Sequence, residues 1–196
     1  MEMEQRRLGI LDAQANGSRS GGPSFSLGHR AHRAVWKLTW ALLAAWTPAP
    51  LHPWRALLLR LFGAKLASNA RVHGSAKIWY PPNLTMEVNT LIGPVVTCYS
   101  MAPIRICAHA IVSQGAHLCA GTHDIDDPHF QLVARPITIG ANAWVAAEAF
   151  VGPGVIVEEG AVLGARGVAL KDLPAWSVHA GNPARFIRQR ARITSP

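Results

Sequence analysis

The chain has 196 residues, of which 49% are hydrophobic and 15% charged, and its formal net charge at pH 7 is +8. This length fits one domain with an ordinary core and a tail, and the apolar content excludes a mainly disordered chain. The three cysteines form no CxxC pair and no zinc-type Cys/His spacing, which favours free thiols in a reducing compartment over disulfides.

The positive charge is unevenly distributed. No acidic residue occurs between Ala13 and Leu66, where seven basic residues stand: Arg19, Arg30, Arg33, Lys37, Arg55, Arg60 and Lys65. A second basic group, Arg185, Arg188, Arg190 and Arg192, lies near the C-terminus. Such segments attract phosphate in a cofactor, an anionic lipid or a nucleic acid. Nucleic acid is not expected as a partner, because no recognised motif accompanies the charge.

The N-terminal third divides into two parts. Residues 1–28 are polar, rich in Gly and Ser and without periodicity, so we expect a disordered tail, with no secretory signal peptide. Residues 29–66 contain two short apolar runs separated by prolines, which predict two short helices. Neither run reaches the roughly 18–20 apolar residues that span a bilayer. Tryptophans flanked by basic residues suit a membrane interface, but they could equally cap the domain core.

From Arg71 onward, aliphatic residues recur every six positions. The series is Val72, Ile78, Leu84; Met86, Ile92, Cys98, Ile104; Ile106, Val112, Leu118; Ile139, Val145, Val151, Val157, Leu163 and Ala169. A period of six fits neither a helix nor a simple strand, but it fits a triangular solenoid in which three hexads close one coil. We therefore predict an all-β solenoid of about five coils over residues 67–183, followed by a basic C-terminal extension at 184–196.

The array has local irregularities. The register slips by two residues at Leu84/Met86, Ile104/Ile106 and Ile137/Ile139, which predicts slightly longer corners there. Glycine often follows the aliphatic residue, as at Gly93, Gly140, Gly152 and Gly164, and we expect these glycines to provide unusual backbone angles at tight corners.

Several blocks of sequence resemble the hexapeptide-repeat acyltransferases. Gly121-Thr122-His123-Asp124, a loop and the block Pro136–Val145 look like the colanic-acid-type O-acetyltransferase branch of that family, and Lys171-Asp172-Leu173-Pro174 and Ala180–Arg185 continue the likeness. The resemblance implies a left-handed parallel β-helix, a homotrimer, and acetyl transfer from acetyl-CoA to a sugar hydroxyl without a required metal. Glu87, Cys107 and Glu158 depart from the family pattern, which usually has glycine there.

The resemblance also implies roles for individual residues. His123 precedes the long interruption Asp124–Pro136 and corresponds to the family's general base; a neutral imidazole is well matched to accepting a hydroxyl proton. Tyr99, Ser100 and Asp124 are the candidate acceptor contacts. For acetyl-CoA, the small residues Ala147 and Ala165 would line the pantetheine groove, and the cations Lys171, Arg185 and Arg188 would bind the phosphates.

The expected acceptor is a sugar in an exopolysaccharide or a lipid-linked glycan precursor. This places the protein in the cytoplasm, with peripheral contact to the inner face of the membrane as a further expectation.

Two other functions are compatible with a solenoid. Three histidines, His109, His117 and His123, could hold zinc in a carbonic-anhydrase-type hydratase. A non-catalytic scaffold is the other alternative, because the departures at Cys107 and Glu87 could belong to a degenerate relative.

Overall fold

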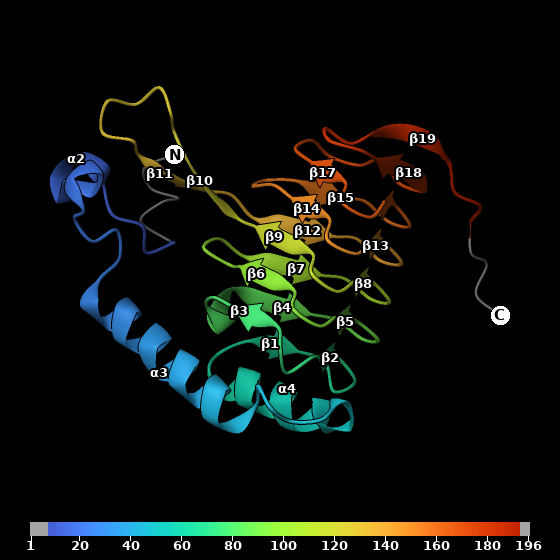
Figure 1. Ribbon diagram of the computed structural model, residues 1–196, viewed down its shortest axis with the longest axis horizontal. Helices are drawn as coiled ribbons and strands as arrows, with labels where there is room; N and C mark the ends of the chain where they lie inside the picture. Colours follow the sequence, from blue (N-terminus) through green and yellow to red (C-terminus); the bar gives the residue numbers. More distant parts are fainter. Residues whose placement is uncertain (1–7, 193–196) are drawn as a thin grey trace.

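The computed structural model describes residues 8–192 and shows a parallel β-helix with helices at one end and along one side (Figure 1). Residues 1–7 of the expected tail and 193–196 of the expected C-terminal extension lie outside the described residues.

The strands form three stacked sheets, here called A, B and C. Sheet A contains β1 (Lys65–Leu66), β4 (Leu84–Met86), β7 (Ile104–Ile106), β12 (Ile137–Ile139) and β15 (Ile156–Val157). Sheet B contains β2 (Arg71–Val72), β5 (Leu91–Ile92), β8 (Ile111–Val112), β13 (Trp144–Val145), β16 (Val162–Leu163), β18 (Ser177–Ala180) and β19 (Arg185–Gln189). Sheet C contains β3 (Lys77–Ile78), β6 (Thr97–Tyr99), β9 (His117–Cys119), β14 (Phe150–Val151) and β17 (Val168–Ala169).

Neighbouring strands within each sheet come from successive coils and run parallel, except that β19 pairs antiparallel with β18. The three sheets give five complete coils, and β18 adds part of a sixth. The predicted fold, a left-handed parallel β-helix with a short helical N-terminal part, is confirmed.

The hexad residues build the core by stacking on their equivalents one coil away. In sheet B, for example, Val72 pairs with Ile92, Ile92 with Val112, Val112 with Val145 and Val145 with Leu163, and all five side chains are fully buried. Stacked aliphatic side chains remove their surface from water on both sides, which is the main stabilising term of the solenoid.

The two-residue register slips all fall on sheet A. Both members of each slip are buried, and Leu84, Ile104 and Ile137 stack on one another, as do Met86, Ile106 and Ile139. The extra residues precede these strands, so the corner between sheets C and A, here the C–A corner, is the longer one. The long interruption leaves the solenoid at this same corner.

The expected role of the corner glycines is wrong in one respect. Gly93 and Gly140 do not have positive φ; the left-handed residue comes two positions later, at Val95 (φ 54°) and Asn142 (φ 58°). A Cβ on Gly140 would lie 2.7 Å from the carbonyl carbon of Glu158, one coil away. Glycine is therefore needed because the next coil approaches closely, not for its own φ.

Two glutamates that stand where the family pattern usually has glycine bind the backbone of the next coil. Glu87 Oε2 accepts a hydrogen bond from the Ala108 N–H at 3.0 Å, and Glu158 Oε2 accepts one from the Ala175 N–H at 2.9 Å. The side chains thus pair backbone donors at the corners.

The helical part comprises α2 (Ala13–Asn16), η1 (Ser18–Ser20), α3 (Leu27–Leu43), η2 (Ala49–Leu51) and α4 (His52–Leu61); a further turn, η3 (Pro81–Asn83), lies within the solenoid. Of the two arrangements considered for the tryptophans, Trp36 and Trp40 adopt the capping one. Both are buried, and their Nε1–H groups donate to the carbonyl oxygens of Ile78 (2.7 Å) and Gly74 (2.9 Å). Trp46, in contrast, is 72% exposed.

A buried arginine ties α4 to the first coil. Arg55 is inaccessible to solvent, and its guanidinium donates to the carbonyl oxygens of Val72, Pro48 and Ala49 at 2.7–2.9 Å and to the hydroxyl of Thr47. Arg55 therefore has a structural role, and it is not available for phosphate. Among residues 8–192, no helix is both long and apolar enough to cross a bilayer.

Residues 8–26, where composition predicts disorder, instead pack against the long interruption of the solenoid. The Ala13 N–H donates to Gln131 Oε1 at 2.7 Å, and Arg19 donates to the Pro128 carbonyl oxygen at 2.8 Å. In Figure 1, α2 lies beside the β10–β11 hairpin. The partners are more than 100 residues apart in sequence, so local composition gives no sign of them.

Candidate active site

The long interruption is a β-hairpin that carries His123. Strand β10 (Gly121–His123) pairs antiparallel with β11 (Leu132–Ala134), with His123 opposite Leu132. The hairpin leaves the solenoid between β9 and β12, so it begins at Gly121, three residues before the expected start at Asp124. Two paired strands hold His123 more firmly than an open loop would.

The His123 ring is fixed in orientation and in tautomer. Its Nδ1 atom lies 2.9 Å from the carbonyl oxygen of Phe130, and the two rings stack at a centroid distance of 4.2 Å. A carbonyl oxygen can only accept, so Nδ1 of the neutral imidazole carries the proton. The lone pair is then on Nε2, the arrangement that a general base requires.

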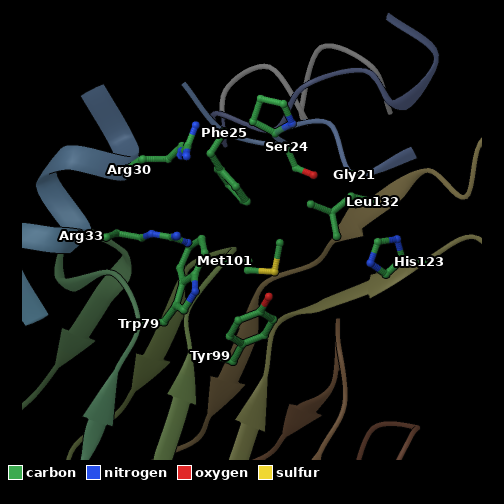
Figure 2. A pocket seen from close by; sticks show the side chains of 11 residues that line it. Gly21, Ser24, Phe25, Arg30, Arg33, Trp79, Tyr99, Met101, His123 and Leu132 are labelled. Atoms are coloured by element: carbon green, nitrogen blue, oxygen red, sulfur yellow. The ribbon is translucent and has the colours of Figure 1, made fainter. Parts of the chain in front are cut away.

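His123 lines a cleft of about 530 Å³ between the N-terminal segment, the C–A corner and the hairpin (Figure 2). The lining residues are Gly21, Pro23, Ser24, Phe25, Arg30, Arg33, Trp79, Tyr99, Met101, His123 and Leu132. Aromatic walls and a few polar groups beside a potential base are typical of a small-molecule site.

A second, smaller cleft of about 320 Å³ also borders His123. It is lined by Thr122, His123, Asp124, Ile125, Val133, Arg135 and Pro153. His123 is the residue common to both clefts.

The three candidate acceptor contacts occupy different environments. Tyr99 lines the larger cleft, where burial raises the pKa of its phenol, and Asp124 lines the smaller one. Ser100 is fully buried, and its Oγ donates to the Tyr80 carbonyl oxygen and accepts from the Tyr80 N–H, both at 3.0 Å. Ser100 therefore does not reach either cleft, since its hydroxyl is used to join two coils.

The candidate acetyl-CoA contacts do not lie together with His123 in one chain. Ala147 and Ala165 stack at the corner between sheets B and C, here the B–C corner, where the Arg166 N–H donates to the Ala147 carbonyl oxygen at 2.9 Å. Lys171 follows β17 at the C–A corner, and Arg185 and Arg188 are exposed on β19.

The three histidines of the hydratase alternative are dispersed. His109 sits at the corner between sheets A and B with φ 61°, His117 is in β9 against the Phe150 ring, and His123 is in the hairpin. In the described part of the chain, no group of three His, Cys, Asp or Glu side chains could hold a metal ion. The geometry needed for a three-histidine zinc site is therefore not present there.

Several residues at the site could not be predicted from the sequence. Phe25, Arg30 and Arg33 come from the N-terminal segment, and Phe130 orients the imidazole. The basic stretch without acidic residues contains Arg30 and Arg33, but charge alone does not indicate which of its arginines face a cleft.

Comparison with known proteins identifies the family. No protein-family model matches the chain. The putative colanic acid biosynthesis acetyltransferase WcaF of Escherichia coli (strain K12) is 43% identical over 173 residues, covering 86% of this chain and 95% of that protein. The chain belongs to the hexapeptide-repeat acetyltransferases, in the branch of the colanic acid biosynthesis enzymes.

A more distant relative and a solved structure are consistent with this family. The galactoside O-acetyltransferase of Escherichia coli (strain K12) is 26% identical over 145 residues, covering 72% of this chain and 71% of the relative. A solved structure of a galactoside acetyltransferase in complex with coenzyme A has the same fold. Its TM-score is 0.76 at 24% identity, and the match covers 87% of this chain and 88% of the other.

Proposed function

We propose that this protein transfers the acetyl group of acetyl-CoA to a sugar hydroxyl in polysaccharide biosynthesis, with His123 as the general base. The observation that carries the proposal is the Nδ1 contact to the Phe130 carbonyl oxygen, which leaves Nε2 free to accept a proton. The colanic acid role in the name of the 43% identical relative and the family's use of acetyl-CoA support the substrate classes.

The chemistry requires one proton to move twice. As the sugar oxygen attacks the thioester carbonyl carbon, Nε2 of His123 takes the hydroxyl proton, which makes the oxygen a stronger nucleophile. The imidazolium keeps its Nδ1–H bond to the Phe130 carbonyl throughout. When the C–S bond breaks, His123 returns the proton to the leaving sulfur, so the products are the acetyl ester and free CoA thiol.

We propose that the site is completed between subunits of a homotrimer. Within one chain, Ala147 and Ala165 are at the B–C corner, whereas His123 extends from the C–A corner on a projecting hairpin (Figure 1). Closed threefold symmetry can bring the C–A corner of one protomer against the B–C corner of its neighbour. The small side chains at 147 and 165 would then leave room for the pantetheine arm, and Lys171, Arg185 and Arg188 would supply cations for the phosphates.

Complementation tests the shared site. His123→Ala should remove the base, and Ala147→Trp should fill the groove, so each variant alone should be nearly inactive. If the two residues act from different protomers, trimers assembled at random from an equimolar mixture of the two variants should regain about one quarter of wild-type activity. Absence of recovery in trimers that have demonstrably mixed would contradict a site shared between these two residues.

The proposed location is the cytoplasmic face of the membrane. Several apolar side chains of the helical segment are exposed, with fractions of 61% for Leu38 and Leu42 and 72% for Leu61. The basic residues and the lack of acids between residues 13 and 66 suit an anionic lipid surface.

Liposome flotation tests this location. The triple change Leu38→Ser, Leu42→Ser, Trp46→Ser should release the protein from phosphatidylglycerol vesicles, while Ile111→Ser, Ile156→Ser on the solenoid should not. Unchanged partitioning of the triple variant would reject the membrane contact.

An acetyl-CoA thiol-release assay tests the function directly. Free thiol should appear in step with acetylated product when one of a panel of sugars, nucleotide-sugars or lipid-linked sugars is added. A non-catalytic scaffold would neither release thiol with any acceptor nor bind CoA in a calorimetric titration.

A further inference from the structure

The larger cleft has a cationic wall. Arg30 and Arg33 both come from α3, and Figure 2 shows them on the side of the cavity opposite His123. Trp79, which directly follows β3, and Tyr99, in β6, lie between these two sides, so the cleft joins a potential base to a pair of guanidinium groups across an aromatic surface.

Arg33 is held in place without an acidic partner. Its guanidinium carbon lies 4.1 Å from the centroid of the Trp79 ring and 5.5 Å from that of Phe25, so the planar group is stacked and oriented. Its Nε is buried and has no hydrogen-bond partner among the described residues. The ion pairs found in that part of the chain are both elsewhere, between Arg105 and Glu87 and between Arg166 and Glu148.

Arg55 differs from Arg33 in its hydrogen bonding. All three guanidinium nitrogens of Arg55 donate to protein acceptors, most of them backbone carbonyl oxygens. Burial is the main reason why the pKa of Arg33 is lowered; Tyr99 acts in the opposite direction, and the charge of Arg30 lowers it further. An anion bound between Arg30 and Arg33 would offset the desolvation of the Arg33 guanidinium and its repulsion by Arg30.

We infer that the acceptor sugar carries an oxyanion, a phosphate or a carboxylate, which Arg33 binds together with Arg30 while a sugar hydroxyl reaches His123. This inference rests on the proposed function and narrows its substrate class. Trp79 and Tyr99 would pack against the sugar ring between the two ends. The candidate phosphate contacts for CoA, Lys171, Arg185 and Arg188, line neither cleft at His123, which favours the acceptor over the cofactor as the source of the anion.

The test compares anionic and neutral acceptors that are built on the same two sugars. Thiol release is measured with the 1-phosphates, the uronates and the methyl glycosides of glucose and galactose. We expect at least one anionic class to have a kcat/KM at least tenfold above that of the methyl glycosides, and the two anionic arms distinguish phosphate from carboxylate. Arg33→Gln should lower kcat/KM for that class by about 10- to 100-fold. Methyl glycosides should be unaffected, and Arg33→Lys should recover part of the loss.

Arg71→Gln is the matched control, since Arg71 is an exposed arginine on sheet B, and it should change nothing. Equal activity of wild type toward anionic and neutral acceptors would overturn the inference but leave acetyl transfer intact. So would an Arg33→Gln effect of equal size on every acceptor, or one expressed as a higher KM for acetyl-CoA.

If no acceptor of any class is acetylated, the proposed function fails, and binding decides the inference separately. The same phosphates and uronates are then titrated calorimetrically into His123→Ala with and without Arg33→Gln. Binding that depends on Arg33 supports the anion site, and no binding of either anionic class overturns it.

Discussion

The carbonyl oxygen of Phe130 lies 2.9 Å from Nδ1 of His123, and the Phe130 ring stacks on the imidazole. One residue thus fixes both the tautomer, through its backbone, and the ring plane, through its side chain. Mutation of the Phe130 side chain should leave the tautomer of His123 unchanged, but it should release the orientation of the imidazole ring.

Phe130→Ala should therefore reduce kcat without removing the base. Loss of the stacked ring frees rotation of the imidazole, and we expect kcat to fall roughly 3- to 10-fold with little change in the KM for acetyl-CoA. Steady-state kinetics would measure this. Ile111→Ala, an exposed apolar residue in β8 that lines neither cleft, is the control and should be near wild type.

The segment before α3 should hold the hairpin in its working position. Gln131→Ala removes the acceptor of the Ala13 N–H, and we expect a loss of about fivefold in kcat together with faster amide exchange over residues 124–131. Gln114→Ala, at an exposed corner, should change neither. Unchanged exchange in the Gln131 variant would show that this contact does not restrain the hairpin.

Arg55 should be far more important for stability than an exposed, ion-paired arginine. Arg55→Met removes the hydrogen bonds that the buried guanidinium donates to the carbonyl oxygens of Val72, Pro48 and Ala49, and we expect the free energy of unfolding to fall by about 3 kcal/mol or more. Arg105→Met breaks the exposed pair with Glu87 and should be within about 1 kcal/mol of wild type. Urea unfolding of both variants gives the comparison.

Acid should weaken the junction between α4 and the first coil. Burial, chiefly, and the nearby charges of Arg55 and Arg71 lower the pKa of His52 from 6.5, although a backbone contact to Val72 opposes this. The unfolded chain therefore binds the proton first as pH falls. The stability that neutral His52 provides is complete above about pH 6.5 and is lost as pH falls toward the folded-state pKa.

The urea midpoint of wild type should accordingly drop between pH 7 and pH 5, and His52→Gln should reduce that drop. His129→Gln, in the exposed turn of the hairpin, serves as the control. An identical pH dependence in wild type and His52→Gln would exclude His52 as a contributor.

The solenoid could be predicted because its determinants are local and periodic. Each hexad places one aliphatic residue on the axis, and residues such as Ile92, Val112 and Val145 are buried as the period requires. The start of the hairpin is the exception, because the chain leaves the solenoid at Gly121, three residues before the expected start at Asp124. Pattern alone does not reveal where pairing changes from parallel to antiparallel.

The site was only partly predictable. His123 could be assigned from its place beside the interruption and from the family motif. The packing of residues 8–26 on the hairpin, the partner of Ala13 and the burial of Ser100 depend on contacts between residues far apart in sequence. Composition correctly marked Arg30 and Arg33 as part of a basic segment. Only the fold separates them from the structural Arg55.

The most direct test is the acetyl-CoA thiol-release assay with an accepted sugar, run on wild type, His123→Ala and His129→Ala. We expect His123→Ala to lower kcat by about 10²- to 10⁴-fold, while CoA affinity and the urea midpoint stay near wild type and His129→Ala stays active. Acetylation that continues undiminished in His123→Ala would contradict the assignment of the base.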